Sequence, residues 1–183
     1  MRPSRWLPAA VALLGLIATG SSAGAACVDA DNDTICDLPV QILFARLTRN
    51  LKPLPRAKII LEGEFFTEPD QGDVFDASAD ITFRVTEAIG LDRTFVLPST
   101  SCLRLITGRI RCIDPTGTIR GLFVPLPGAP NIFHFRVKAA RLDIGGPYAP
   151  PVTVTITHND GSNRRGEIDE CRNSKKGMSC KAL

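Results

Sequence analysis

Apolar and polar residues alternate along several segments of this chain, and a period of two residues predicts β-strands. The longest such segment is 131–144, where Phe133, Phe135 and Val137 share one face and His134 lies on the other. Other segments with the same character are 57–66, 81–86, 93–97, 102–113, 118–124 and 151–158. Their β-branched residues suit a pleated, half-buried surface.

Residues 38–50 carry an ambiguous pattern. Val40, Leu43 and Leu47 fit a helical stripe, but the segment fits a strand equally well, with Ile42 and Phe44 on one face and Leu43, Ala45 and Leu47 on the other. A turn region containing Pro53 and Pro55 follows and leads into the strand at 57–66. A hairpin is more economical than an isolated helix here, so the sequence predicts a strand.

The chain therefore has about nine to eleven short strands and no convincing helix after its N-terminal segment, which predicts an all-β fold of two packed layers. In strand length and spacing it resembles immunoglobulin-like and fibronectin-type modules. The resemblance is one of pattern, because the only tryptophan is Trp6 and no Cys…Trp…Cys arrangement is present. The expected fold is an antiparallel immunoglobulin-like β-sandwich with local disulfide-clamped hairpins.

The first 26 residues have the features of a secretory signal peptide. Arg2 and Arg5 precede an apolar run at 7–17, and Ala23-Gly24-Ala25 offers a cleavage site. The run is shorter than the roughly 20 residues that span a bilayer, and no later segment is long and apolar enough to do so. An alternative is a lipid anchor on Cys27. The expected organisation is a signal peptide (1–26), an acidic disulfide-closed segment (27–39) and a β-sandwich domain (40–183) in a secreted, periplasmic or cell-surface protein.

All six cysteines follow this signal and form three local pairs in the sequence: Cys27 and Cys36, Cys102 and Cys112, Cys171 and Cys180. In an exported protein such pairs favour disulfides over metal thiolates. The segment 102–113 predicts a hairpin that turns near Gly108, and Gly177 lies between the last two cysteines in a similar way. Each bond is expected to stabilise the fold by about 2–3 kcal/mol.

The segment from Cys27 to Asp37 places acids at alternate positions: Asp29, Asp31 and Asp33, followed by Asp37. Alternating carboxylates can turn toward one hard cation, which takes six to eight oxygen ligands. The spacing resembles the calcium repeats of thrombospondin type 3 and, less closely, an EF-hand loop.

This resemblance covers about nine residues. It implies calcium ligands at Asp29, Asp31, Asp33 and Asp37 and at the backbone carbonyl of Ile35. The sequence departs from the pattern at Thr34, where glycine is expected, and at Val40, where an acid is expected. The implied calcium site is therefore weak, and a solvated acidic segment is the alternative interpretation.

The formal net charge of +3 falls to +1 without Arg2 and Arg5, which argues against nucleic-acid binding. Residues 27–80 carry eleven acids and five bases, whereas residues 81–183 carry eight acids and fifteen bases. The bases form three groups: Arg104, Arg109 and Arg111; Arg136, Lys138 and Arg141; and Arg164, Arg165, Lys175 and Lys176. They are either ordinary solvated faces or, if they coincide, a surface for an acidic polysaccharide or an anionic membrane. Tyr148 is the only tyrosine, which argues against an aromatic platform for glycans.

No catalytic motif is present in the sequence. His134 is expected on the surface and His158 at a turn, while Glu62 and Glu64 share a strand face, as a glycosidase pair would. Alternating exposed glutamates are far commoner than such a pair. We therefore predict no enzyme, but a structural or interaction module with a weak calcium site and an unidentified protein partner. A binding module for anionic polymers is the alternative, and an extracellular hydrolase is the third interpretation.

Overall fold

A computed structural model describes residues 37–51, 55–67, 75–158 and 163–183 of the protein. Apart from one 3-10 turn, η2 (Ser99–Ser101), the regular structure of this part is β-sheet. The strands are β1 (Asp37–Thr48), β2 (Ala57–Phe66), β3 (Ile81–Glu87), β4 (Asp92–Leu97), β5 (Cys102–Arg104), β6 (Ile110–Ile113), β7 (Ile119–Leu126), β8 (Ala129–Leu142), β9 (Val152–His158), β10 (Asn163–Ile168), β11 (Cys171–Ser174) and β12 (Gly177–Lys181). The described residues contain no helix long and apolar enough to cross a membrane.

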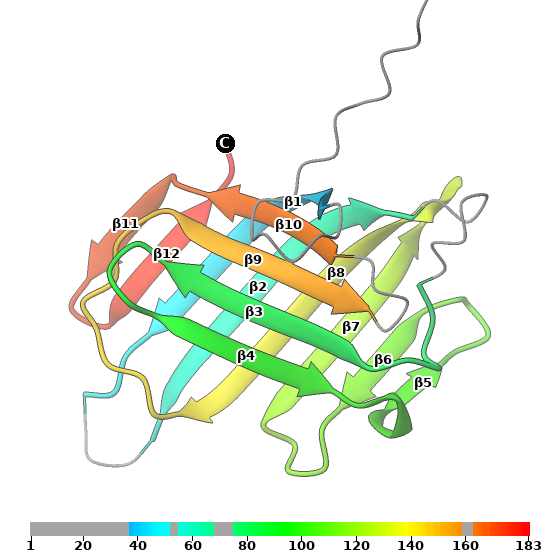
Figure 1. Ribbon diagram of the computed structural model, residues 1–183, viewed down its shortest axis with the longest axis horizontal. Coiled ribbons are helices and arrows are strands. Elements are labelled where there is room, and N and C mark those ends of the chain that lie inside the picture. The colour runs from blue at the N-terminus through cyan, green and yellow to red at the C-terminus, as the bar shows by residue number, and fades with distance from the viewer. Residues whose placement is uncertain (1–36, 52–54, 68–74, 159–162) are drawn as a thin grey trace, which may run out of the picture.

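The twelve strands form one continuous mixed sheet, which curls so that its two halves pack face to face as layers (Figure 1). One layer has the order β4-β3-β9-β10, and the other has the order β1-β2-β8-β7-β6-β5. The strands of the first layer cross those of the second at a steep angle in Figure 1. The β11–β12 hairpin extends the second layer beyond β1.

Strand β1 connects the two layers. Its first residues, Asp37 to Pro39, pair in parallel with β10 of the first layer. From Val40 onward it pairs with β2 of the second layer, with a register shift between Ile42 and Phe44. Such irregularities bend a strand, which allows one strand to serve two sheets at a corner.

The all-β prediction is confirmed, and each predicted strand segment corresponds to a strand, including 38–50 as β1. The sheet is mixed, however, because β1 and β10 run parallel. A wholly antiparallel immunoglobulin-like sandwich is therefore not confirmed. The alternation within β1 identified a strand but carried no information about a partner more than a hundred residues away.

Aromatic side chains fill much of the space between the layers. The Phe65 and Phe75 rings pack edge to face with centroids 4.8 Å apart, and Phe83, Phe123 and Phe135 are fully buried around them. The second layer meets β4 at Gly121, where an added Cβ would come within 2.7 Å of Leu97. A side chain at this position would force the buried Leu97 to shift, so glycine favours the close contact between β7 and β4.

Two of the predicted disulfides lie in the described residues. Cys102 pairs with Cys112 across β5–β6, and Cys171 pairs with Cys180 across β11–β12. Both hairpins have the clamped form that the sequence predicts. Two disulfides indicate that the protein folds in an oxidising, non-cytosolic compartment.

Candidate basic groove

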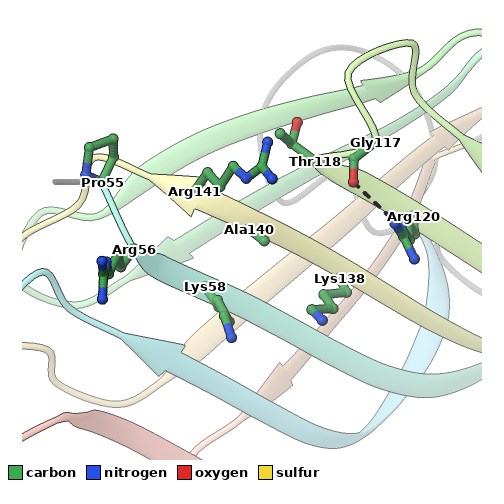
Figure 2. A pocket seen from close by; sticks show the side chains of 9 residues that line it. All are labelled: Pro55, Arg56, Lys58, Gly117, Thr118, Arg120, Lys138, Ala140 and Arg141. Atoms are coloured by element: carbon green, nitrogen blue, oxygen red, sulfur yellow. Dashed lines mark hydrogen bonds between the residues drawn. The ribbon is translucent and has the colours of Figure 1, made fainter.

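The outer face of the second layer has an open basic groove of about 660 Å³. It is lined by Pro55, Arg56, Lys58, Gly117, Thr118, Arg120, Lys138, Ala140 and Arg141. Figure 2 shows the cationic side chains coming from the neighbouring strands β2, β8 and β7 and, for Arg56, from the residue just before β2. None of these described lining residues is acidic.

The five cations lie together because of strand register. Lys138 of β8 lies opposite Arg120 of β7 on one side and opposite Ile60 of β2 on the other. Lys58 lies opposite Ala140, two residues along the same face of β8. All five side chains are exposed, and none forms an ion pair in the part of the chain that the structure describes. The groove is thus a site of uncompensated positive charge.

Arg141 has a left-handed backbone conformation, with φ of 58°, and is the only non-glycine residue with positive φ among those described. It lies at the register shift between β2 and β8, where Ala57 pairs with Leu142 and Lys58 pairs with Ala140. Bulges of this kind re-aim a side chain, and here Arg141 is turned into the groove. A left-handed conformation costs a residue with a Cβ about 1–2 kcal/mol, and such strain is concentrated at functional sites.

The turn between β6 and β7 forms one wall of the groove and is held by Asp114. Its carboxylate accepts hydrogen bonds from the N–H of Ile119 at 2.6 Å and from the hydroxyls of Thr116 and Thr118. Burial raises the pKa of Asp114, but these hydrogen bonds outweigh it and leave the pKa below its ordinary value. The turn ends with the Arg120 Nε donating to the Gly117 carbonyl at 3.4 Å, the bond drawn in Figure 2.

Farther along the same face, acids and bases are paired. The Arg136 Nε lies 3.0 Å from the Glu62 carboxylate, and the His134 Nδ1 lies 3.5 Å from the Glu64 carboxylate. Both pairs join directly opposite positions of β2 and β8. The two glutamates therefore each have a basic neighbour, and no described pocket is lined by both of them. This arrangement offers no support for a glycosidase pair.

The three basic groups of the sequence are only partly brought together. Lys138 and Arg141 line the groove, whereas Arg136 is paired with Glu62. Arg165 lies 3.6 Å from Glu167, and Lys175 and Lys176 belong to the β11–β12 turn outside the groove.

The interpretation of these basic residues as surface residues is wrong for Arg164. It is fully buried, with its guanidinium 5.0 Å from the centre of the Phe65 ring and 5.7 Å from that of Phe75. A buried guanidinium over aromatic faces belongs to the core and is unavailable to a ligand.

Two other residues singled out in the sequence are buried. His158 lies in the core rim, with its ring 5.1 Å from that of Phe75 and its Nε2 3.3 Å from the carbonyl of Asp76. Tyr148 is buried and donates its hydroxyl to the Thr48 carbonyl at 3.2 Å. Neither side chain is placed to contact a ligand in the groove.

The predicted calcium ligands Asp29, Asp31, Asp33 and Ile35, and the predicted disulfide between Cys27 and Cys36, lie outside the described residues. Asp37 begins β1. The described residues contain no group of three or more histidines, cysteines, aspartates or glutamates arranged to hold a metal.

Sequence patterns did not single out Arg56, Lys58 and Arg120. The alternating pattern did contain a signal for two of them, because Lys58 and Arg120 occupy outward positions of their strands. What the sequence could not supply was the pairing of β2 and β7 with β8, which places the three strands side by side. No protein-family model, curated protein or solved structure matches the chain.

Proposed function

We propose that this protein is an exported binding module for a polyanion, such as an acidic polysaccharide, and that the basic groove holds the anionic groups of the ligand. The observation that carries the proposal is the groove itself, where four cations from β2, β7 and β8, together with Arg56 just before β2, face solvent and form no ion pair among the described residues. Sulfate, phosphate and carboxylate groups are the natural counter-charges for such a site.

The mixture of cations suits a repeating polymer. Arg56, Arg120 and Arg141 offer planar guanidinium groups that can bind an oxyanion with two hydrogen bonds. Lys58 and Lys138 offer compact charges on flexible stems. An open groove has room for a chain to run through it, whereas a closed pocket would favour a single small anion.

The proposal assigns the protein a binding role and no catalytic one. It includes export directed by residues 1–26, and an immunoglobulin-like use of the β-scaffold to present a surface. A calcium-ordered segment at residues 29–37 and a protein partner stay part of this hypothesis. Their support is the sequence pattern alone.

Heparin-affinity chromatography tests the groove. The wild-type protein should stay bound above about 0.15 M salt, where charges more than about 8 Å apart are largely screened. Lys138→Glu should elute at clearly lower salt. Lys175→Glu makes the same change in net charge outside the groove and should elute close to the wild type. Equal shifts for the two variants would show that only diffuse charge is involved, and would overturn the proposal.

A further inference from the structure

The β5–β6 hairpin has an apolar tip that is fully exposed. The Gly108 N–H donates to the Leu105 carbonyl at 2.9 Å, and the Leu105 N–H donates to the Arg109 carbonyl at 2.7 Å, so residues 105–108 form a tight turn. Ile106, near the apex of this turn, has a relative exposure of 108%, while Leu103 and Leu105 are 63% and 40% exposed.

Exposed apolar side chains are concentrated at this hairpin. Among the described residues, Leu51, Ile89, Val96 and Leu183 are scattered over the fold. The other four large exposed apolar residues are Leu103, Leu105 and Ile106 of the hairpin, and Leu122 of β7, which lies opposite Arg111 of β6. Single exposed apolar residues are normal, whereas a contiguous group marks a surface that contacts an apolar phase or partner.

Three arginines surround the apolar tip. Arg104, Arg109 and Arg111 are exposed, and none forms an ion pair among the described residues. Arg111 lies directly opposite Leu103 in the hairpin, so charge and apolar surface alternate on one face. Arg104 acts electrostatically on Asp76, whose pKa is held below its usual value by its hydrogen bonds with Ser78 and, to a smaller extent, by His158 and Arg104.

We infer that the β5–β6 hairpin docks on the surface of a lipid bilayer that contains anionic lipids, with Leu105 and Ile106 entering the headgroup region. This combination of an apolar tip and a basic rim is what such a surface recognises, because the apolar side chains leave water while the arginines meet phosphate. A wholly apolar protein partner would leave three guanidinium groups without counter-charge. The inference rests on residues outside the groove and does not depend on the proposed polyanion.

The tip of the hairpin is held in an ordered conformation before it binds anything. Cys102 and Cys112 occupy opposite positions in the β5–β6 pair, and their disulfide closes the base of the loop. Cys112 is buried and its strand pairs with β7, which anchors the hairpin to the second layer. A tip that is already ordered loses little conformational entropy on binding.

A tryptophan placed at the tip tests this inference directly. Trp6 is the only tryptophan of the chain and lies in the proposed signal peptide, so the protein without residues 1–26, or the full chain with Trp6→Phe, gives a background without tryptophan fluorescence. On that background, Ile106→Trp should shift its emission to shorter wavelength when vesicles of phosphatidylcholine and phosphatidylglycerol are added. Ile89→Trp is the matched control, because Ile89 is also an exposed isoleucine in a turn but lies beside Glu87 and Asp92. No shift at position 106, or equal shifts at both positions, would overturn the inference.

A second experiment separates the hairpin from the groove. The double variant Leu105→Ser, Ile106→Ser should lose at least about tenfold in vesicle co-sedimentation while its elution from heparin stays unchanged. Binding should also fall sharply on pure phosphatidylcholine vesicles. If Lys138→Glu abolishes vesicle binding and the serine variant does not, the groove and not the hairpin holds the vesicle. If the wild type is a dimer in solution that the serine variant dissociates, the tip is a self-association surface, and the inference fails.

Discussion

Lys138 of β8 and Arg120 of β7 lie directly opposite each other on the outer face of the second layer. Like charges at opposite positions of an antiparallel pair repel and weaken the sheet by about 0.2–1 kcal/mol. Two residues away on β8 there is no such repulsion, because Arg136 faces Leu122 of β7 and forms an ion pair with Glu62 of β2. The groove therefore keeps like charges together where a neighbouring position has a favourable ion pair, as is expected of a binding site and not of a stabilising surface.

Substitutions of Lys138 should change the stability of the protein and its heparin binding in opposite directions. Lys138→Glu turns the repulsion into attraction and should raise the free energy of unfolding by about 0.2–1 kcal/mol in urea titrations. The same variant should bind heparin more weakly. Lys138→Met removes the repulsion without adding an attraction, so its stability should fall between the two. A Lys138→Glu protein less stable than the wild type would contradict this account.

The sequence pattern was sufficient for the strands and for the clamped hairpins, because both depend on neighbours close in the chain. Phe133, Phe135 and Val137 lie inward as their alternation predicts, and Cys102 faces Cys112. The parallel pairing of β1 with β10 was beyond such patterns, since it joins the two ends of the described fold.

The groove was inaccessible to sequence reasoning for the same reason. Its cations come from β2, β7, β8 and the residue before β2, and only the pairing of β2 and β7 with β8 brings them together. For Arg164 the sequence pattern misled in the opposite way, because a residue expected at the surface lies in the core. Its charge suggested a surface position, but β10 lies beside β9 and β1, and the guanidinium is buried over two phenylalanine rings.

Arg141 offers a test of backbone strain at the groove. Glycine adopts its left-handed conformation without penalty, so Arg141→Gly should be more stable than Arg141→Ala by about 1 kcal/mol. Both variants remove the guanidinium and should weaken heparin binding equally. The measurement is a pair of urea titrations alongside affinity elution. An alanine variant as stable as the glycine variant would show that φ at this position carries no strain.

Asp114 should make the groove wall sensitive to acid. Its pKa in the folded protein lies below the ordinary value of 3.8, so its stabilising contribution is complete above that value. The contribution is lost as the pH falls through the lowered pKa of the folded state. Asp114→Asn, which loses acceptor capacity for the Thr116, Thr118 and Ile119 donors, should destabilise the protein by about 1–3 kcal/mol at neutral pH.

Unfolding measured along a descending pH series checks this prediction. The difference between Asp114→Asn and the wild type should be largest near neutral pH and should shrink in strong acid. A difference that stays constant over the whole series would mean that the carboxylate charge is not what holds the turn.

The acidic segment makes a separate prediction about calcium. Strand β1 begins at Asp37, and its first residues form the parallel pairs with β10. An ion that orders residues 29–37 would therefore steady this junction, and millimolar calcium should raise the melting midpoint by a few degrees. Asp31→Asn combined with Asp33→Asn should abolish the rise, and magnesium at the same concentration serves as the control ion. An unchanged midpoint would remove calcium from the hypothesis.

The position of β1 has a consequence for how the protein matures. Strand β1 lies near the start of the described chain. On one of its two sides, its partners are residues 163–165 and 177–181, which lie near the other end. A nascent chain that has emerged only as far as β9 can pair β1 with β2 but cannot close the corner between the layers. Completion of this corner must wait for residues 163–181, so an incompletely synthesised chain holds the two layers together less tightly than the whole protein does. The Cys171–Cys180 bond belongs to the same late segment and can form only once residues 171–180 have been synthesised.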